Sequence, residues 1–286
     1  MNFRIVVLIK QVPDTTAVTV QAMKADGTLN RSALPAVFNP EDLNALEMAL
    51  EIRQRYGGSV CAITMGPPSA AAILREALYR GADRVLLVTD RTFAAADTLA
   101  TSYVLSRAVR SVGNADIVLC GRQAIDGNTA QVGPQVAEKL NMNQLTYVET
   151  IEALAAGRIT VRRSVEEGSE RVQATLPVLL TVTGAANVPR PPSVKKIMRY
   201  KKARTVQELA GEESAENLTA RGLLIETLHA ADLDVDTAMC GLAGSPTRVK
   251  KIESVVLKGK SFVRVEPTES GIRDLLHELI RDYTFD

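Results

Sequence analysis

The chain has 286 residues, of which 46% are hydrophobic, so it can form one large domain or one domain with an appendage. A formal net charge of +1 gives no reason to expect nucleic acid or a membrane surface as a partner. No apolar run is long enough for a transmembrane segment, and the N-terminus is typical of a strand rather than a signal peptide. Three cysteines, Cys61, Cys120 and Cys240, form no C-x-x-C pair, which favours a reduced, cytosolic protein.

The first half of the chain alternates apolar runs with helical patterns. Continuous apolar runs are typical of strands that are buried on both faces of a parallel sheet, and they occur at 3–9, 59–65, 84–89 and 116–120. A turn signal, Asp26-Gly27, separates two short strand-like pieces after the first run. Helical patterns follow the runs, at 39–56, 69–80, 95–112 and from 135. This alternation predicts an α/β fold, a parallel sheet with helices on both faces.

Polar residues follow the expected strands at their carboxyl ends. A polar loop at 10–15 follows the first strand, and Asn39 then stands as a favourable N-cap before Pro40. Asp42 lies in the first turn of that helix and is expected either to bond a ribose hydroxyl or to cap the helix. Open α/β sheets bind their ligands at this edge, so we expect Lys10, Asn39 and Asp42 to share one site with residues 64–66.

The segment 121–134, GRQAIDGNTAQVGP, is the strongest candidate for a binding site. It lies between a strand and a helix start, where free N–H groups and the helix dipole favour a phosphate. We expect three glycines, Gly121, Gly127 and Gly133, to let the backbone approach a ligand. An ordinary turn is the alternative, but fourteen residues exceed the usual βα connection of roughly 2–6. Short polar side chains line the segment: Asp126, Asn128, Thr129 and Gln131.

The second half of the chain has a different pattern. Short strand patterns at 148–154, 159–164, 171–175 and 178–183 predict an antiparallel extension of the sheet. Residues 186–204 combine three prolines with six basic residues in ten, which indicates a solvated face or a docking surface for an acidic partner. The last apolar positions, from Ile272 to Ile280, recur at helical spacing. A helix with such a stripe packs on its own core or on another subunit, and the first is commoner.

The sequence shows no catalytic machinery. There is no G-x-S-x-G and no paired histidine and cysteine, and the G-x-G-x-x-G dinucleotide fingerprint is absent after the first strand. Such a domain either binds a regulatory nucleotide or positions a cofactor that performs the chemistry.

Five motifs together resemble the β-subunit of electron transfer flavoproteins along nearly the whole chain. They are residues 10–15 (KQVPDT), 39–42 (NPED), 81–84 (GADR), 121–134 and 187–198. Each motif alone is weak, whereas five in order at the family's spacing are specific. The resemblance implies an adenine-nucleotide α-hydrolase-like fold and a cytoplasmic heterodimer with an α-subunit that carries FAD.

The resemblance also implies the cofactor. The β-subunit of this family holds either AMP, as a structural ligand, or a second FAD. The AMP-binding branch has consecutive acids in the central loop and no proline at its end, whereas this chain has residues 126–129 (DGNT) and ends in Pro134. Asn128 stands where an acid is commoner in the FAD branch. The chain is thus similar to the FAD-binding, electron-bifurcating branch, in which NADH gives a hydride to the flavin and electrons leave singly along two routes.

Residue by residue, the resemblance implies a cofactor site and a partner site. The implied cofactor contacts are Leu8, Lys10, Asn39, Asp42, Ala62, Thr64, Gly66, Gly121, Arg122, Gln123, Ala124, Asp126, Gly127, Asn128, Thr129, Gln131, Val132, Gly133 and Pro134. The implied contacts with an acyl-CoA-type or other flavin dehydrogenase are Pro189, Val194, Lys195, Ile197 and Met198. Ferredoxin or flavodoxin is the implied second acceptor.

Three units are expected along the chain. Residues 1–185 form the nucleotide-binding domain with its extension, 186–204 the partner-recognition loop, and 205–286 a C-terminal arm on the α-subunit. Three functions remain open on the sequence: an FAD-binding redox subunit, an AMP-binding structural subunit, or a regulatory ATP-binding protein of the universal-stress kind.

Overall fold

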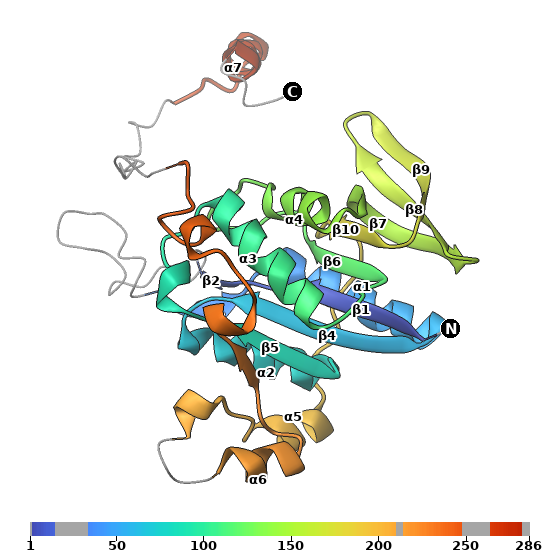
Figure 1. Ribbon diagram of the computed structural model, residues 1–286. Helices are drawn as coiled ribbons and strands as arrows, with labels where there is room; N and C mark the ends of the chain where they lie inside the picture. The colour runs from blue at the N-terminus through green and yellow to red at the C-terminus, as the bar shows by residue number, and fades with distance from the viewer. Residues whose placement is uncertain (1, 15–33, 210–213, 248–263, 282–286) are drawn as a thin grey trace, which may run out of the picture.

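The computed structural model describes residues 2–14, 34–209, 214–247 and 264–281. Most strands join one sheet in the order β11-β5-β4-β1-β6-β10-β7-β8-β9 (Figure 1). The expected turn at Asp26-Gly27 lies outside the described residues. None of the described helices has both the length and the apolar character needed to cross a membrane.

The parallel core consists of strands that are apolar on both faces. These strands are β1 (Phe3–Leu8), β4 (Gly58–Met65), β5 (Arg84–Val88), β6 (Ile117–Gly121) and β10 (Val178–Val182). From β1 the chain moves to β4 and β5 on one side and then to β6 on the other side of β1. The strand order therefore reverses between β1 and β6, which is where a doubly wound sheet opens a crevice for a ligand.

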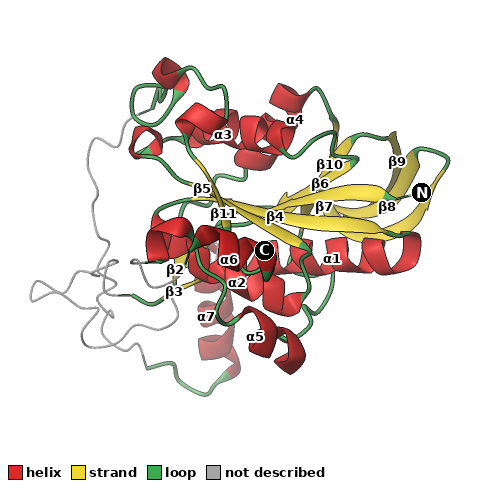
Figure 2. Ribbon diagram, turned by 60° about the horizontal axis from the view of Figure 1, so that its bottom comes forward, coloured by secondary structure: helices red, strands yellow, loops and turns green. Residues whose placement is uncertain are grey.

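Two layers of helices cover the sheet, as the alternation predicts (Figure 2). On one face α1 (Pro40–Tyr56) and α2 (Ala71–Arg80) pack on Ile5 and Val7 of β1. On the other face α3 (Thr98–Ser111) and α4 (Val132–Leu140) pack on Val6 and Leu8. Successive residues of β1 thus point to opposite cores, as the alternation of side chains along a strand requires. Short 3-10 turns precede α2 and α3, at Pro68–Ala70 and Arg91–Phe93.

The predicted antiparallel extension is partly wrong. Strands β7 (Asn143–Ala155), β8 (Arg158–Val165) and β9 (Gly168–Thr175) form an antiparallel meander. By contrast, β10 pairs in parallel with both β6 and β7, so it belongs to the parallel core. All five residues of β10 are buried, which is the pattern of a strand covered on both faces. The start of the polar loop after β1 forms a short strand, β2 (Gln11–Pro13). This strand pairs with β3 (Ala36–Phe38) in a separate two-stranded sheet.

The C-terminal third completes the α/β domain instead of forming an arm throughout. Helices α5 (Val194–Tyr200) and α6 (Ala215–Ala220) lie beyond α2, joined by a 3-10 turn at Val206–Glu208. Strand β11 (Glu226–Leu228) then pairs with β5 at the edge of the main sheet. Two further 3-10 turns follow, at Ala230–Asp232 and Thr237–Met239, and bury Leu233 and Cys240 in the α3 core. The expected boundary at 205 therefore lies too early in the chain.

The last helix, α7 (Glu269–Arg281), is the part that fits an arm. It buries no residue against the described chain, and its apolar stripe is exposed at Ile272, Leu276 and Ile280. Figure 1 shows it apart from the sheet. The commoner expectation, packing on its own core, is not met among the described residues.

The contact of α4 with the sheet leaves no room for a side chain at Gly133. A Cβ there would lie 2.8 Å from Cys120 Sγ and 2.9 Å from Thr181 Cγ2. We expect Gly133→Ala to lower the free energy of unfolding by about 1–3 kcal/mol, because either α4 or the sheet must shift. Gly127→Ala is the control, since no atom lies within 4 Å of its Cβ position. Equal urea midpoints for the two variants would contradict this packing.

Candidate functional site

A cleft of about 1200 Å³ opens at the carboxyl ends of the parallel strands. Residues from the ends of β1, β4, β5 and β6 and the residue after β11 line it, together with the first turns of α3 and α4. Predicted site residues in the lining are Leu8, Lys10, Asp42, Gly66, Gly121, Arg122, Gln123, Ala124, Gly127, Asn128, Thr129, Gln131, Val132 and Gly133. The structure thus brings most of the predicted residues together in one place.

Asp42 joins the two strands at which the sheet order reverses. One carboxylate oxygen accepts the N–H of Gly121 and the other accepts the N–H of Lys10, both at 2.8 Å. These residues lie at the end of β6 and just after β1. The expected capping role of Asp42 is therefore wrong, because neither donor belongs to α1. Burial raises the pKa of Asp42 to about 7, although the two N–H groups oppose this shift.

Asn39 occupies the N-cap position of α1, but its side chain serves the central loop. Its amide nitrogen donates to Gln123 O at 2.9 Å, and its amide oxygen accepts the N–H of Ile125 at 3.1 Å. The Asn39 side chain is fully buried, so these two backbone groups of the loop are hydrogen-bonded to protein instead of to water. The structure thus gives Asn39 a supporting role behind the lining of the cleft, where it holds the central loop.

Ion pairs fix the rest of the loop against Lys10, just after β1, and against the first turn of α1. Lys10 Nζ lies 2.7 Å from Asp126, and Arg122 lies 3.0 Å from Glu41. Glu41 also accepts the N–H of Gln123 at 3.0 Å. Asp126 is thus neutralised by a neighbour at the mouth of the cleft, so it does not repel an anionic ligand.

Packing requires two of the three loop glycines, Gly121 and Gly133, and both also line the cleft. A Cβ on Gly121 would lie 2.6 Å from Asp42 Oδ1, and Gly133 meets the sheet in the same way. Only Gly127 faces open space. The left-handed turns fall instead on Asn128 and Ala130, with φ of 50° and 53°. Asparagine tolerates this conformation better than most residues, which accounts physically for Asn128 at this position.

The two helices that start at the cleft, α3 and α4, differ in whether the N–H groups of their first turns have acceptors. The side chain of Gln131 does not cap α4, and the N–H groups of Val132 and Gly133 have no acceptor within the helix. The Asp97 side chain, by contrast, caps α3 by accepting from Leu99 and Ala100. Although burial raises it, these hydrogen bonds and those from Thr247 hold the pKa of Asp97 below its usual range. The first turn of α4 is thus suited to an anion, and that of α3 is already filled by a carboxylate.

Some predicted residues lie behind the lining of the cleft. Asn39, Ala62 and Thr64 are fully buried, and Pro134 occupies the first turn of α4. The hydroxyl of Thr64 has no hydrogen-bond partner within the described structure, although Met65 and Gly66 beside it line the cleft. A buried hydroxyl without a partner is uncommon and marks a place where a ligand or water completes the bonding.

Sequence reasoning missed the far wall of the cleft. This wall comprises Asp90, Arg91, residues 94–98, Gln207, His229 and Thr247. Its members come from four separate stretches of the chain. Among them only Asp97 and Thr98 belong to a recognisable sequence pattern, the start of a helix. Strand β11, which positions His229, is three residues long and has no recognisable apolar period.

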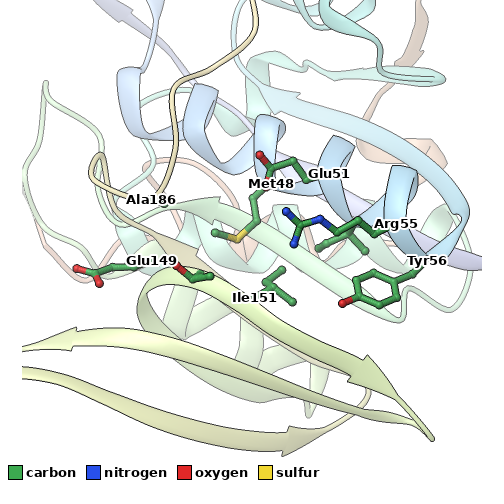
Figure 3. Close-up of a pocket in the computed structure, with 9 residues that line it drawn as sticks. Met48, Glu51, Arg55, Tyr56, Glu149, Ile151 and Ala186 are labelled. Carbon is green, nitrogen blue, oxygen red and sulfur yellow. The ribbon is translucent and has the colours of Figure 1, made fainter.

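A smaller hollow of about 200 Å³ lies on the opposite face, between α1 and β7 (Figure 3). Met48 and Arg55 of α1 border it on one side and Ile151 of β7 on the other. It is smaller than the roughly 300–1,000 Å³ of small-molecule sites and lies away from the strand ends that carry the predicted residues. The larger cleft is therefore the candidate site.

The segment 186–204 is held firmly on α1 and α2. Asn44 donates to the Asn187 carbonyl at 2.8 Å, and Arg190 donates to the Glu47 carboxylate at 2.8–3.0 Å. Burial raises the pKa of Glu47, but the bonds and charge of Arg190 outweigh it and hold this pKa below its ordinary value. Arg80 further donates to the Arg190 carbonyl.

This anchoring leaves only part of the predicted partner surface free. Val194 and Met198 are 75% and 61% exposed, and Lys195 is exposed beside them. Ile197 and Pro189 are partly buried within the chain, so they expose less surface than the other three residues. Lys195, Lys196 and Arg199 lie on the helix α5.

Comparisons with known proteins decide the family. A family model described as an electron transfer flavoprotein domain matches residues 26–213. The β-subunit of the electron transfer flavoprotein of Clostridium acetobutylicum is 42% identical over 279 residues, 98% of each chain. The chain belongs to the electron transfer flavoprotein family, as a β-subunit. Membership in this family leaves the regulatory ATP-binding hypothesis without support.

Other relatives extend the range of the family. Protein FixA of Sinorhizobium fredii is 40% identical over 282 residues, covering 96% of this chain and 92% of its own. The caffeyl-CoA reductase-Etf complex subunit CarD of Acetobacterium woodii is 41% identical over 258 residues, covering 90% and 89%.

The raised pKa of Asp42 predicts how the stability of the chain depends on pH. The pKa of Asp42 is about 7 in the folded chain, against 3.8 for an ordinary aspartate. Its carboxyl therefore stabilises the folded state most below pH 4. This stabilisation is lost as the pH rises to 7. At about 1.4 kcal/mol for each pKa unit, it amounts to roughly 4 kcal/mol of the free energy of unfolding. Asp42→Asn removes the titration and sets an amide N–H₂ against one backbone N–H, which costs about 1–3 kcal/mol.

Urea unfolding of both proteins between pH 4 and pH 8 measures this effect. We expect the wild type to be more stable than Asp42→Asn at pH 4 and the difference to narrow towards pH 7. A difference in the free energy of unfolding that widens with pH would show that the ionised carboxylate is the stabilising form, and would contradict the raised pKa of Asp42.

Proposed function

We propose that the chain binds FAD in the cleft and works in a heterodimer with an α-subunit. The observation that carries this proposal is the extent of the cleft. Its volume of about 1200 Å³ exceeds the roughly 300–1,000 Å³ of ordinary small-molecule sites. The cleft also reaches from α4 to the residue after β11, which is more room than a mononucleotide fills.

The groups around the cleft fit a dinucleotide. The N–H groups of Val132 and Gly133, which have no acceptor within α4, provide for a phosphate. Leu8, Met65 and Val88 give an apolar surface between the two ends of the cleft. When bound, the flavin would accept a hydride from NADH and release single electrons to the α-subunit FAD and to a second acceptor. In this proposal the protein itself binds and orients the cofactor.

The relatives support a role beside acyl-CoA redox enzymes. One is named acryloyl-CoA reductase electron transfer subunit gamma, from Anaerotignum propionicum, and another belongs to a caffeyl-CoA reductase complex. We therefore propose an acyl-CoA-type or other flavin dehydrogenase as the partner in the cytoplasm, with ferredoxin or flavodoxin as the low-potential acceptor. The exposed stripe of α7 is proposed to contact the α-subunit, because an apolar helix face gains free energy when a partner covers it.

The second candidate is a structural subunit whose cleft holds AMP. The first turn of α4 favours it as much as it favours FAD, because both ligands carry the adenosine phosphate. In that case the chain supports a simple electron shuttle, and all redox chemistry belongs to the α-subunit.

The number of flavins per heterodimer separates the two candidates. We expect two FAD per purified heterodimer from the absorbance spectrum and the protein concentration. A single FAD with one AMP, identified after acid release and chromatography, would establish the AMP-binding alternative instead.

The exposed part of 186–204 is the proposed docking surface for the dehydrogenase. Val194 and Met198 offer apolar anchors, and Lys195 and Arg199 surround them with positive charge. Since Glu47 and Arg190 already fix the segment, little ordering entropy is lost when a partner binds. Apolar anchors carry binding energy, whereas rim charges mainly set the rate of encounter.

We expect Val194→Ala to weaken docking to the dehydrogenase by about 1 kcal/mol, the order of a truncated interface anchor. Flavin content and NADH reduction should remain normal, because Val194 does not line the cleft. Binding assays and stopped-flow reduction with NADH measure both effects. Val165→Ala is the control, since Val165 is an exposed valine on the distant β8 strand. Normal docking with failed NADH reduction would place this segment at the cofactor site.

A further inference from the structure

Helix α5 carries two adjacent lysines with different surroundings. Ser193, the residue before the helix, donates its N–H to the Tyr79 carbonyl at 3.0 Å, so the start of α5 is fixed on the last turn of α2. In this position Lys195 is exposed, whereas Lys196 is partly buried against the end of α2. The two lysines therefore share one helix but not one environment.

The amine of Lys196 lies where a side chain at Gly81 would be. Its Nζ is 2.9 Å from the Cβ position of Gly81, the C-cap residue of α2. A methyl group of Leu50 and Nη2 of Arg53, both from α1, lie 3.5 and 3.6 Å from the same point. The amine thus shares this space with an apolar group and with another cation.

The groups that would attract the Lys196 ammonium are already bonded to Arg53. Nη1 of Arg53 donates to the Gly81 carbonyl at 2.9 Å and to the Asp83 carboxylate at 2.7 Å. Within the ranges that the structure describes, Lys196 has no ion pair of its own, whereas Arg53 and Arg190 each pair with a carboxylate. A cation beside another cation, without its own carboxylate, is poorly stabilised.

These surroundings favour the neutral amine. Burial lowers the pKa of Lys196, and the charge of Arg53 lowers it further. Asp83 opposes this shift, whereas Arg190 and Arg199 add to it. A larger fraction of Lys196 than of an ordinary exposed lysine is therefore neutral near neutral pH. Only the neutral amine has the lone pair that attacks a carbonyl carbon.

The charge around Lys196 favours an electrophile that is itself a polyanion. Residues 195–204 contain six basic residues and no acid. Such a patch attracts polyanions and raises their local concentration. An acyl-CoA combines several phosphate charges with a thioester, whose carbonyl carbon reacts with amines. The helix therefore brings together the reactive amine and the charge that attracts this class of compound.

We propose that Lys196 is a site of covalent acylation by acyl-CoA thioesters. In this step the neutral Nζ attacks the thioester carbonyl carbon, so that a C–N bond forms and the C–S bond breaks. The thiolate of coenzyme A leaves and takes up the proton that Nζ loses, and the products are an amide and the free thiol. The reaction uses no residue of the cleft, so it does not depend on which nucleotide the cleft holds. The amide removes one positive charge next to Lys195, beside the proposed docking surface.

Reaction of the full-length chain with isotopically labelled acetyl-CoA tests this site. After digestion, fragment-ion mass spectrometry measures the label on Lys195 and on Lys196 separately over time. We expect Lys196 to acquire label at least about threefold faster than Lys195, because the rate follows the fraction of neutral amine. Lys195 is an internal control, since it lies on the same helix of the same molecule.

Two arginine variants test the physical cause. In Arg53→Gln the cation beside Lys196 is lost and Asp83 is released to pair with the ammonium, so we expect labelling of Lys196 to slow towards the rate of Lys195. Arg55→Gln is the matched control, because Arg55 lies two residues further along α1 and borders the hollow beside β7. Thermal melting checks that both variants keep the fold.

Three results would overturn the inference. Equal labelling of Lys195 and Lys196, or label on neither, would show that the surroundings of Lys196 do not activate it. Slower labelling of Lys196 than of Lys195 would show that burial protects the amine instead. An unchanged rate at Lys196 in a folded Arg53→Gln variant would remove the stated cause. If that variant does not fold, the comparison of the two lysines in the wild type still decides.

Discussion

The buried carboxylate of Asp42 holds together the two strands on which the site depends. It accepts N–H groups that follow β1 and end β6, at the point where the strand order reverses. Strands diverge at such a point and leave their last N–H groups without partners, so a side chain from α1 has to supply the acceptor. The hydrogen bond from Gly121 to Asp42 also fixes the start of the 121–134 loop relative to the sheet. Asn39 and Glu41, which flank the start of the same helix, then hold the loop at Gln123 and Ile125.

The chemistry of the cleft follows from the starts of its two helices. Because Asp97 already caps α3, the negative charge there discourages a second anion, whereas the first turn of α4 keeps free N–H groups. These charges favour an anion at the α4 end of the cleft rather than at the α3 end. From the α4 end an apolar floor of Leu8, Met65 and Val88 leads towards His229.

Local sequence patterns predicted the fold where strands are long and apolar. The four parallel strands predicted in the first half of the chain and both helix layers are confirmed, because each leaves a local signal of period, turn or cap. The direction of β10 could not be predicted, since a fully buried strand has the same pattern in either direction. The roles of Gly121 and Gly133 depend on Asp42 and Cys120, which lie far away in sequence or on another element. His229 was missed because its strand is too short to show a period.

The position of the nucleotide on the first turn of α4 is the central claim, and amide hydrogen exchange tests it most directly. The full-length chain would be exchanged alone, with AMP and with FAD, and the peptides that contain Val132 and Gly133 compared. The account predicts slower exchange at these amides with either nucleotide. Unchanged exchange at Val132 and Gly133 with nucleotide bound would contradict the account.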